Sequence, residues 1–135
     1  MRTDYMQQNN PILDQNRYQL GQAGETQVVH YLVTQGFTIK ERNYRKRYGE
    51  IDIIAQKDEL LVFVEVKIRR QSYFNLSEII TRSKQRKIIH VACEYISRHQ
   101  VIDKVCRFDV ALLEHFSGTQ ANLTYYPHAF AQEGW

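Results

Sequence analysis

Cysteine and long apolar runs are scarce in this chain of 135 residues. The 2 cysteines, Cys93 and Cys106, have neither a metal-ligand nor a redox spacing, so we expect reduced thiols and a cytoplasmic protein. The longest apolar run, 60–64, is far shorter than the roughly 18 to 20 residues that a membrane span needs. The N-terminal sequence also lacks the apolar segment of a secretory signal. We therefore expect a soluble protein with no membrane partner.

The motifs of several enzyme classes are absent as well. The chain has no Gly-x-Ser-x-Gly nucleophile elbow, and its 6 glycines match neither the Walker nor the dinucleotide-binding pattern. Its 5 histidines are scattered and form no His-x-x-x-His or Cys/His set of the kind that binds zinc. These absences argue against a serine hydrolase, a nucleotide-binding enzyme and a zinc enzyme.

The composition is that of an ordinary globular domain, with 43% hydrophobic and 24% charged residues. This length predicts a single domain. We expect an α/β domain at 16–130, with a flexible N-terminal tail at 1–15 and a C-terminal tail at 131–135. Apolar periodicity predicts helices at 16–35 and 83–99, a short helical turn near 77–80, and strands at 37–44, 50–56, 60–68, 105–113 and 123–126. The last of these strands is expected at the edge of a sheet.

Residues 49–70 place charged side chains in two segments that are otherwise rich in Ile, Val, Leu and Phe. Burying an ion without a partner is strongly unfavourable. Asp52, Glu65 and Lys67 therefore need partners, a metal ion or a functional reason to be there. This makes the stretch the first candidate for a functional site.

The two segments are predicted to form an antiparallel hairpin, and its register decides whether the acids meet. With the turn tip at 57–58, Asp52 is expected opposite Phe63, and Glu50 opposite Glu65. These four side chains would then share one face of the hairpin with Lys67. Asp52 and Glu65 would be diagonal neighbours, close enough for both carboxylates to bind one cation.

Two carboxylates and a lysine on one face are suited to metal-dependent hydrolysis of phosphodiesters. Carboxylate oxygens bind Mg²⁺ or Mn²⁺ and leave coordination positions for water and a phosphate oxygen. A lysine can orient the attacking water or offset developing negative charge. The alternative is a structural ion pair between Lys67 and one carboxylate, which leaves the other acid without a partner.

Basic residues surround this stretch, although the formal net charge is only +3. Positive charge of this kind binds the phosphates of nucleic acids. A solvated basic loop at 43–48, with its two tyrosines closing over the core, is an equally good interpretation. At the start of the helix at 83–99, cations are unfavourable unless an anion is near, which favours a phosphate partner. The candidates for nucleic-acid contact are Arg45, Lys46, Arg47, Arg69, Arg70, Lys84, Arg86 and Lys87.

An ordered set of short motifs resembles a known family. The segments are 21–25, 43–45, Gly-Glu-Ile-Asp at 49–52, Phe-Val-Glu-Val-Lys at 63–67, 84–86, and Arg-Phe-Asp-Val at 107–110. Together they resemble the small bacterial YraN-type proteins of uncharacterised protein family 0102, across most of the chain. That family is related to the PD-(D/E)XK nuclease superfamily and looks most like its archaeal Holliday-junction resolvases.

The resemblance implies a restriction-endonuclease-like αβββαβ core, with a mixed sheet flanked by helices. It also implies that Asp52 and Glu65 bind the divalent metal and that Lys67 assists the attacking water. Glu25 alone is best interpreted as a solvated helix carboxylate, but the resemblance makes it a third metal ligand. It further implies that Gln85 helps to orient the substrate.

Two positions depart from this pattern or fit it less well. Ile51 stands where many members of the superfamily have proline before the aspartate, a change that leaves the metal ligands intact. Glu50 has two interpretations. It is either a partner of Lys67 that does not itself bind the metal, or an exposed residue at the end of a strand.

These observations predict a divalent-metal-dependent endonuclease that acts on DNA, with branched or otherwise structured DNA as a candidate substrate. One alternative is a non-catalytic nucleic-acid-binding protein with a nuclease-like fold. Another is an interaction module in a DNA repair or recombination complex. The enzyme is favoured because a pure binding protein gains nothing from burying two acids that repel phosphate. Resolvase-like action requires a homodimer, which no feature of the sequence establishes.

Overall fold

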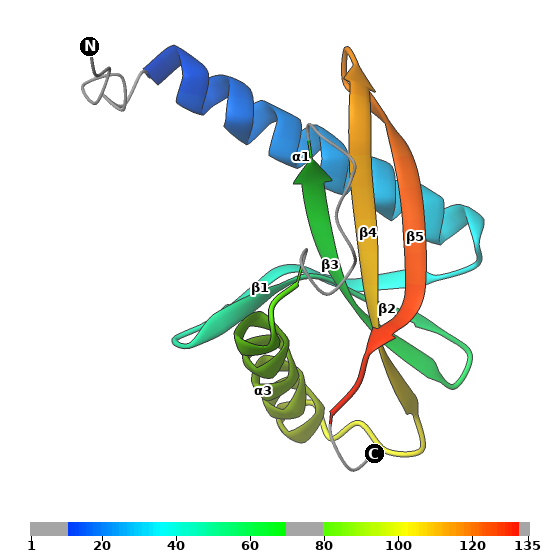
Figure 1. Ribbon diagram of the computed structural model, residues 1–135. Coiled ribbons are helices and arrows are strands. Elements are labelled where there is room, and N and C mark those ends of the chain that lie inside the picture. Colours follow the sequence, from blue (N-terminus) through cyan, green and yellow to red (C-terminus); the bar gives the residue numbers. More distant parts are fainter. Residues whose placement is uncertain (1–10, 70–79, 133–135) are drawn as a thin grey trace.

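The computed structural model describes residues 11–69 and 80–132, with side chains described from residue 17 onward. Along the chain its elements are α1 (Pro11–Thr34), β1 (Thr38–Lys46), β2 (Gly49–Lys57), β3 (Leu60–Arg69), α3 (Arg82–Arg98), β4 (Val105–Ser117) and β5 (Gln120–Phe130) (Figure 1). This order confirms the expected αβββαβ core, which is followed by one further strand. Most of the two expected tails, and almost all of the helical turn expected near 77–80, lie outside the described residues.

The five strands form one mixed sheet in the order β1-β2-β3-β4-β5. All neighbouring strands are antiparallel except β3 and β4, which pair in parallel. Parallel strands need a long crossover connection, and here α3 lies in it. The last strand, β5, is at the edge of the sheet, as the sequence predicts.

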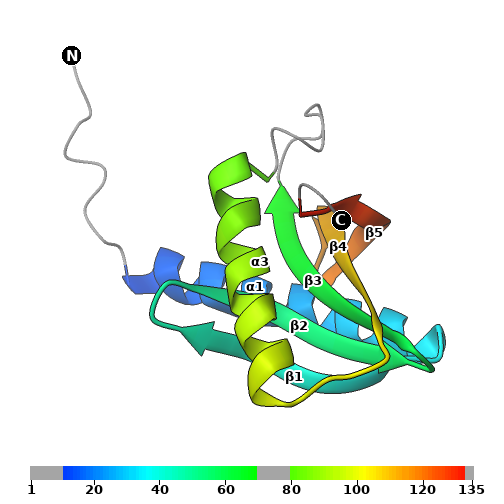
Figure 2. The ribbon, with the colours of Figure 1, turned by 90° about the horizontal axis from the view of Figure 1, so that it is seen from below.

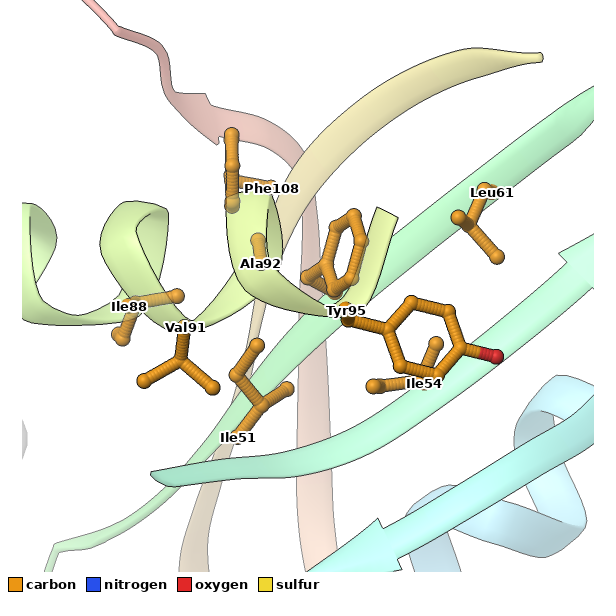
Figure 3. Packing of buried hydrophobic residues seen from close by; sticks show 9 residues of the cluster. Ile51, Ile54, Leu61, Ile88, Val91, Ala92, Tyr95 and Phe108 are labelled. Carbon is orange, nitrogen blue, oxygen red and sulfur yellow. The ribbon is translucent and has the colours of Figure 1, made fainter. Parts of the chain in front are cut away.

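The two helices of the described residues, α1 and α3, cover opposite faces of the sheet (Figures 1 and 2). On one face α1 contributes Val28 and Leu32 to a buried cluster whose strand residues are Ile53, Ala55, Val62, Val64, Ala111 and Leu113. On the other face α3 packs through Ile88, Val91, Ala92 and Tyr95 against Ile51, Ile54, Leu61, Phe63 and Phe108 (Figure 3). No described helix is long and apolar enough to cross a membrane.

Helix α1 begins earlier than the sequence analysis predicts. Its first residue is Pro11, five residues before the start expected at 16. Proline is favourable in the first turn because its fixed φ suits a helix and its missing N–H would have no helical partner there. The residue that breaks helices elsewhere therefore marks the beginning of this one.

Gly24 of α1 allows the helix to lie close to the sheet. A Cβ atom at this position would be 2.7 Å from Leu113 Cδ1 and 3.2 Å from Ile68 Cδ1. Contacts of 2.7 Å are too short for a real Cβ, so a larger residue would move the helix or these side chains. The close approach brings the next residue, Glu25, towards β1 and β2.

The register of the β2–β3 hairpin differs by two residues from the expected one. Lys57 pairs with Leu60, and Ile54 rather than Asp52 pairs with Phe63. The tip of the turn is therefore Asp58 and Glu59. Asp58 has a φ of 53°, a left-handed conformation that aspartate tolerates better than most residues.

Both edge strands of the sheet are irregular. In β1 the pairing with β2 shifts register between Ile39 and Glu41, and Asn43 has a positive φ. Strand β5 contains Pro127, and His128 also has a positive φ. Bulges, prolines and bends of this kind are common at exposed sheet edges.

Candidate metal and nucleic-acid site

The ladder between β2 and β3 stops at the level of the predicted site. The last paired residues at this end are Ile53 and Val64. Next to them, the backbone N–H of Val66 donates a hydrogen bond to Asp52 Oδ2 at 2.8 Å, so a carboxylate takes the place of a strand carbonyl. The two strands therefore hold an acidic side chain between them at this point.

Side-chain alternation in β2 is broken at Asp52. Ile51 belongs to the cluster beneath α3, whereas Ile53, two residues later, belongs to the cluster beneath α1. In a regular strand, residues two apart lie on the same face. Asp52 itself lines a cavity of about 500 Å³ on the α1 side, together with Glu25 and Val66.

Glu65 is approached from the α3 side instead. Its carboxylate Oε1 lies 3.3 Å from Lys84 Nζ, which extends from the first turn of α3, and 4.0 Å from Lys67 Nζ. The expectation that Asp52, Glu65 and Lys67 share one regular face is therefore wrong. The reason is the break in β2 alternation at Asp52.

The two acids nevertheless affect each other electrostatically. Burial raises the pKa of Asp52 to about 7, and the negative charge of Glu65 is the next largest cause. The hydrogen bond from Val66 opposes this rise, while Glu50 and Glu25 add to it. Both burial and the neighbouring negative charges thus disfavour the ionised form of Asp52, so a proton or another cation is favoured there.

Glu25 is held by two partners on β1. Its Oε1 accepts a hydrogen bond from Arg42 Nε at 3.0 Å and another from Asn43 Nδ2 at 3.0 Å. Its side chain is only 12% exposed, so it is not the solvated carboxylate that the sequence alone favours. Among the residues that the structure describes, no three acidic, histidine or cysteine side chains form a ready metal-ligand cluster. The role of Glu25 as a third ligand stays a prediction.

Glu50 contacts a residue of β1 near the predicted site. Its Oε2 accepts a hydrogen bond from Arg45 Nε at 2.9 Å, and both side chains are largely exposed. Arg45 also lines the cavity that contains Asp52. The pair thus lies at the mouth of the site, and the role of Glu50 as a support for Lys67 stays a prediction.

The remaining basic candidates fall into two groups. At the β1–β2 hairpin, Lys46 lies 3.7 Å from Glu94 Oε1, and Arg47 is exposed. Tyr48 of the same hairpin stacks on His90 of α3, so this loop is fixed to the helix.

The second group lies around the start of α3. Arg86 and Lys87 are exposed, whereas Gln85 donates a hydrogen bond to the carbonyl of Ile80 at 3.1 Å. Arg69 ends β3 and is half-buried. Arg70 lies outside the described residues.

Comparison with known proteins identifies the family. The model of uncharacterised protein family UPF0102 matches residues 24–113, which include Glu25, Asp52, Glu65 and Lys67. This chain belongs to the UPF0102 family. It is similar to a UPF0102 protein of Dictyoglomus turgidum, with 39% identity over 85% of this chain and 99% of the relative. Similar proteins of Treponema pallidum (strain Nichols) and Alkaliphilus metalliredigens are 40% and 43% identical, each over 82% of this chain and over 91% and 96% of the relative.

Two residues of this UPF0102 chain contact acids of the candidate site, although the sequence did not indicate either of them as a partner of an acid. Asn43 holds Glu25 and lines the same cavity as Asp52. Asparagine is unusual within a strand, so its position in β1 is the sequence feature that could have marked Asn43 as a candidate. Lys84 was assigned to nucleic acid, but it forms an ion pair with Glu65.

A further buried acid, Asp109 in β4, lies in a complete hydrogen-bond network. Arg107 donates to its two oxygens at 2.8 and 2.9 Å. The Tyr125 hydroxyl donates to Oδ2 at 2.5 Å, and the His128 backbone N–H donates to Oδ1 at 2.9 Å. Burial raises the pKa of Tyr125, which therefore remains a hydroxyl donor. Asp109 therefore forms a structural salt bridge with Arg107.

Proposed function

We propose that this protein is an endonuclease that depends on Mg²⁺ or Mn²⁺ and hydrolyses the phosphodiester bonds of DNA. The proposal rests mainly on Asp52, whose buried carboxylate is influenced by Glu65 at the point where the β2–β3 ladder stops. Two neighbouring acids, one with a raised pKa, are unfavourable to maintain in a sheet. A bound cation would compensate the two carboxylates, and a functional role of this kind explains why both are present.

The donor set fits a hard divalent cation. Mg²⁺ is usually held by one or two carboxylates and keeps several water ligands, so Asp52 and Glu65 are sufficient to hold it. The pKa of Asp52 is raised mainly by burial, and next by the negative charge of Glu65, which a bound cation would offset. A divalent ion bound there would act as a Lewis acid on the phosphate and make a water molecule more acidic.

Lys67 supplies the positive charge of the proposed reaction. Its Nζ is 4.0 Å from Glu65 Oε1, a loose contact that leaves its hydrogens available to other oxygens. Lys67 can therefore orient the attacking water or offset the charge that develops on the phosphate. Asp52 and Glu65 hold the cation, and Glu25 approaches the same cavity from α1.

The proposed DNA contacts come from the β1–β2 hairpin and from α3. Arg45 and Arg47 are exposed on the hairpin, and Arg86 and Lys87 are exposed on the helix. Contacts of this kind are made to phosphates and carry no base sequence, so binding weakens as salt rises. Branched or otherwise structured DNA is the proposed substrate, and cutting both strands of a junction would require a homodimer.

A non-catalytic nucleic-acid-binding protein is the second candidate, and one observation favours it. Glu65 already lies near two lysines, so it does not require a metal ion to be compensated. A relative that had lost activity would keep DNA affinity through its basic surface and would not turn over.

The test is cleavage of linear, flap and four-way DNA by purified protein with Mg²⁺ or Mn²⁺. Asp52→Ala and Lys67→Ala are each expected to lower the rate by about 100-fold or more. Lys40→Ala, at an exposed position of β1, is the matched control and should cut at the wild-type rate. Nicking that persists unchanged in both site variants would contradict the proposal. DNA affinity that survives both changes, without any metal-dependent cleavage, would support the binding protein.

A further inference from the structure

Lys84 occupies a place that the proposed reaction leaves unexplained. Helix α3 begins after Thr81, whose side chain accepts a hydrogen bond from the Lys84 backbone N–H at 3.2 Å. This N-cap fixes the first turn of the helix. The Lys84 side chain extends from that turn, and its Nζ lies 3.3 Å from Oε1 of Glu65. A helix residue therefore contacts a strand residue of the candidate metal site.

Glu65 is buried, and Lys84 provides the nearer of the two lysine ammonium groups that contact it in the described part of the chain. The Glu65 side chain is only 5% exposed, so an ionised carboxylate there needs a counter-charge. Lys84 is nearer to the carboxylate than Lys67, at 3.3 against 4.0 Å, and both approach the same oxygen. A divalent ion bound by that carboxylate would face two ammonium groups close by, which repel it.

The two lysines differ in how readily they can move away. The Lys84 side chain is 39% exposed, whereas that of Lys67 is 28% exposed and lies within a strand. Lys84 can therefore turn towards solvent, where its own charge is hydrated, once another cation compensates Glu65. Lysine also has a long flexible stem, so its ammonium can exchange partners at little cost.

We infer that Lys84 is the internal counter-ion of Glu65 in the metal-free protein and that a divalent cation displaces it. The released ammonium then contacts a phosphate of the bound DNA. This inference rests on the proposed function, because it concerns the same carboxylate. It also explains why a cation is tolerated in the first turn of α3, since Glu65 supplies the anion that such a position requires.

The first experiment measures Mn²⁺ affinity by electron paramagnetic resonance, with no DNA present. Removing a competing positive charge strengthens cation binding, so Lys84→Met is expected to bind Mn²⁺ about tenfold more tightly. Lys84→Arg keeps the charge and should bind close to the wild type. Lys40→Met removes one charge at an exposed distant position and controls for net charge.

A Glu65→Gln background isolates the contact. Glu65→Gln also removes one of the two proposed metal ligands, so Mn²⁺ binds more weakly in this background. Lys84→Met is expected to leave that weaker affinity unchanged, because the pair no longer exists. Circular dichroism and thermal melting of each variant establish that the fold is retained. Unchanged or weaker Mn²⁺ binding by folded Lys84→Met would overturn the inference.

The second experiment tests the contact with phosphate. DNA affinity is measured against salt in a Lys67→Met background, which prevents turnover, with and without Mn²⁺. Lys84→Met is expected to reduce the salt slope by about 1 only when Mn²⁺ is present. Lys87→Met, on the exposed side of the same helix, should reduce it equally in both conditions. A slope that Lys84→Met reduces equally with and without Mn²⁺ would show a permanent phosphate contact and contradict the exchange.

These outcomes separate the inference from the proposed function. Tighter Mn²⁺ binding by Lys84→Met, in a protein that cuts no DNA, would support the exchange and contradict the nuclease. Metal-dependent cutting by the wild type, with Mn²⁺ affinity unchanged in Lys84→Met, would support the nuclease and contradict the exchange.

Discussion

Two buried aspartates of the same sheet have opposite surroundings. Asp109 in β4 is fully buried and accepts hydrogen bonds from a guanidinium, a phenol and a backbone amide. Asp52 in β2 accepts a hydrogen bond from the Val66 amide, and the strongest charge acting on it is the negative charge of Glu65. The first carboxylate is compensated within the protein, and the second is not.

This difference separates a structural acid from a candidate functional one. The Arg107 guanidinium has a raised pKa, mainly because it donates hydrogen bonds to Asp109, so that pair stabilises its own ionised form. Asp52 has a raised pKa for the opposite reason, because burial and a like charge disfavour its ionised form. Removing the charge should therefore have opposite effects on stability at the two positions.

The largest effect is expected from Asp109→Asn. The substitution keeps the volume but removes the partner of Arg107, and breaking a buried pair in this way lowers the free energy of unfolding by about 3 kcal/mol. Chemical denaturation monitored by circular dichroism measures it. Tyr125→Phe, which removes only one donor, should lower it by about 1 kcal/mol. A loss below that of Tyr125→Phe would show that Asp109 is not a structural acid.

Asp52→Asn is expected to stabilise the metal-free protein at pH 8 by about 1 to 3 kcal/mol. Burial and Glu65 raise the pKa of Asp52 from its ordinary value of 3.8 to about 7 in the folded protein, so the unfolded chain loses this proton first. The stability of the wild type should therefore fall as pH rises from about 4 to about 7, and that of the variant should fall less.

Denaturation curves at several pH values, with a chelator present, measure the difference between Asp52→Asn and the wild type. This difference should vanish near pH 4, which lies close to 3.8, the ordinary pKa of an aspartate. It should also shrink in a Glu65→Gln background, because one cause of the raised pKa is removed. If Asp52→Asn and the wild type were equally stable at all pH values, burial of the Asp52 charge would not destabilise the protein. The proposed difference between Asp52 and Asp109 would then be wrong.

Gly24→Ala tests whether the surroundings of Asp52 depend on the close packing of α1 against the sheet. The new Cβ would meet Leu113 and Ile68, so we expect a loss of about 1 to 2 kcal/mol in the free energy of unfolding. Gly21→Ala is the matched control, because nothing lies within 4 Å of its Cβ position. It should stabilise the helix by about 0.5 to 1 kcal/mol. Stabilisation by both changes would show that α1 is free to move away from the sheet.

The smallest effect on stability is expected from Glu50→Gln. Its ion pair with Arg45 is exposed, and pairs of this kind contribute less than about 1 kcal/mol. Thermal melting measures this change, and DNA cleavage measures whether Glu50 also supports Lys67. A loss of activity beyond about tenfold with unchanged stability would show that Glu50 positions a residue of the site.

The order and kind of the elements could be predicted from the sequence because periodic apolar residues dominate them. The five strands and two helices that the structure describes lie close to their expected positions. The hairpin register could not be predicted, because the turn contains neither Gly nor Asn. Asp58 takes the left-handed position that those residues usually mark, which moved the tip by one residue and the pairing by two.

The sequence indicated which residues to consider for the candidate site, but not its geometry. Buried charge among apolar residues identified Asp52 and Glu65, because unpaired ions are unfavourable wherever the chain folds. The break in alternation at Asp52 depends on where the strands separate, which no local pattern encodes. The contact of Lys84 with Glu65 depends on how α3 packs against β3, and tertiary packing of this kind is not visible in sequence spacing.

The irregular edge strands restrict how a second copy could join this protein. Continuous pairing of two sheets through their edges needs an uninterrupted row of backbone donors and acceptors. The bulge and the bend at Asn43 interrupt that row in β1, and Pro127 and His128 interrupt it in β5. A resolvase-like dimer that paired the described edge strands of two copies would therefore have short and interrupted backbone pairing, and side-chain contacts would have to supply most of its stability.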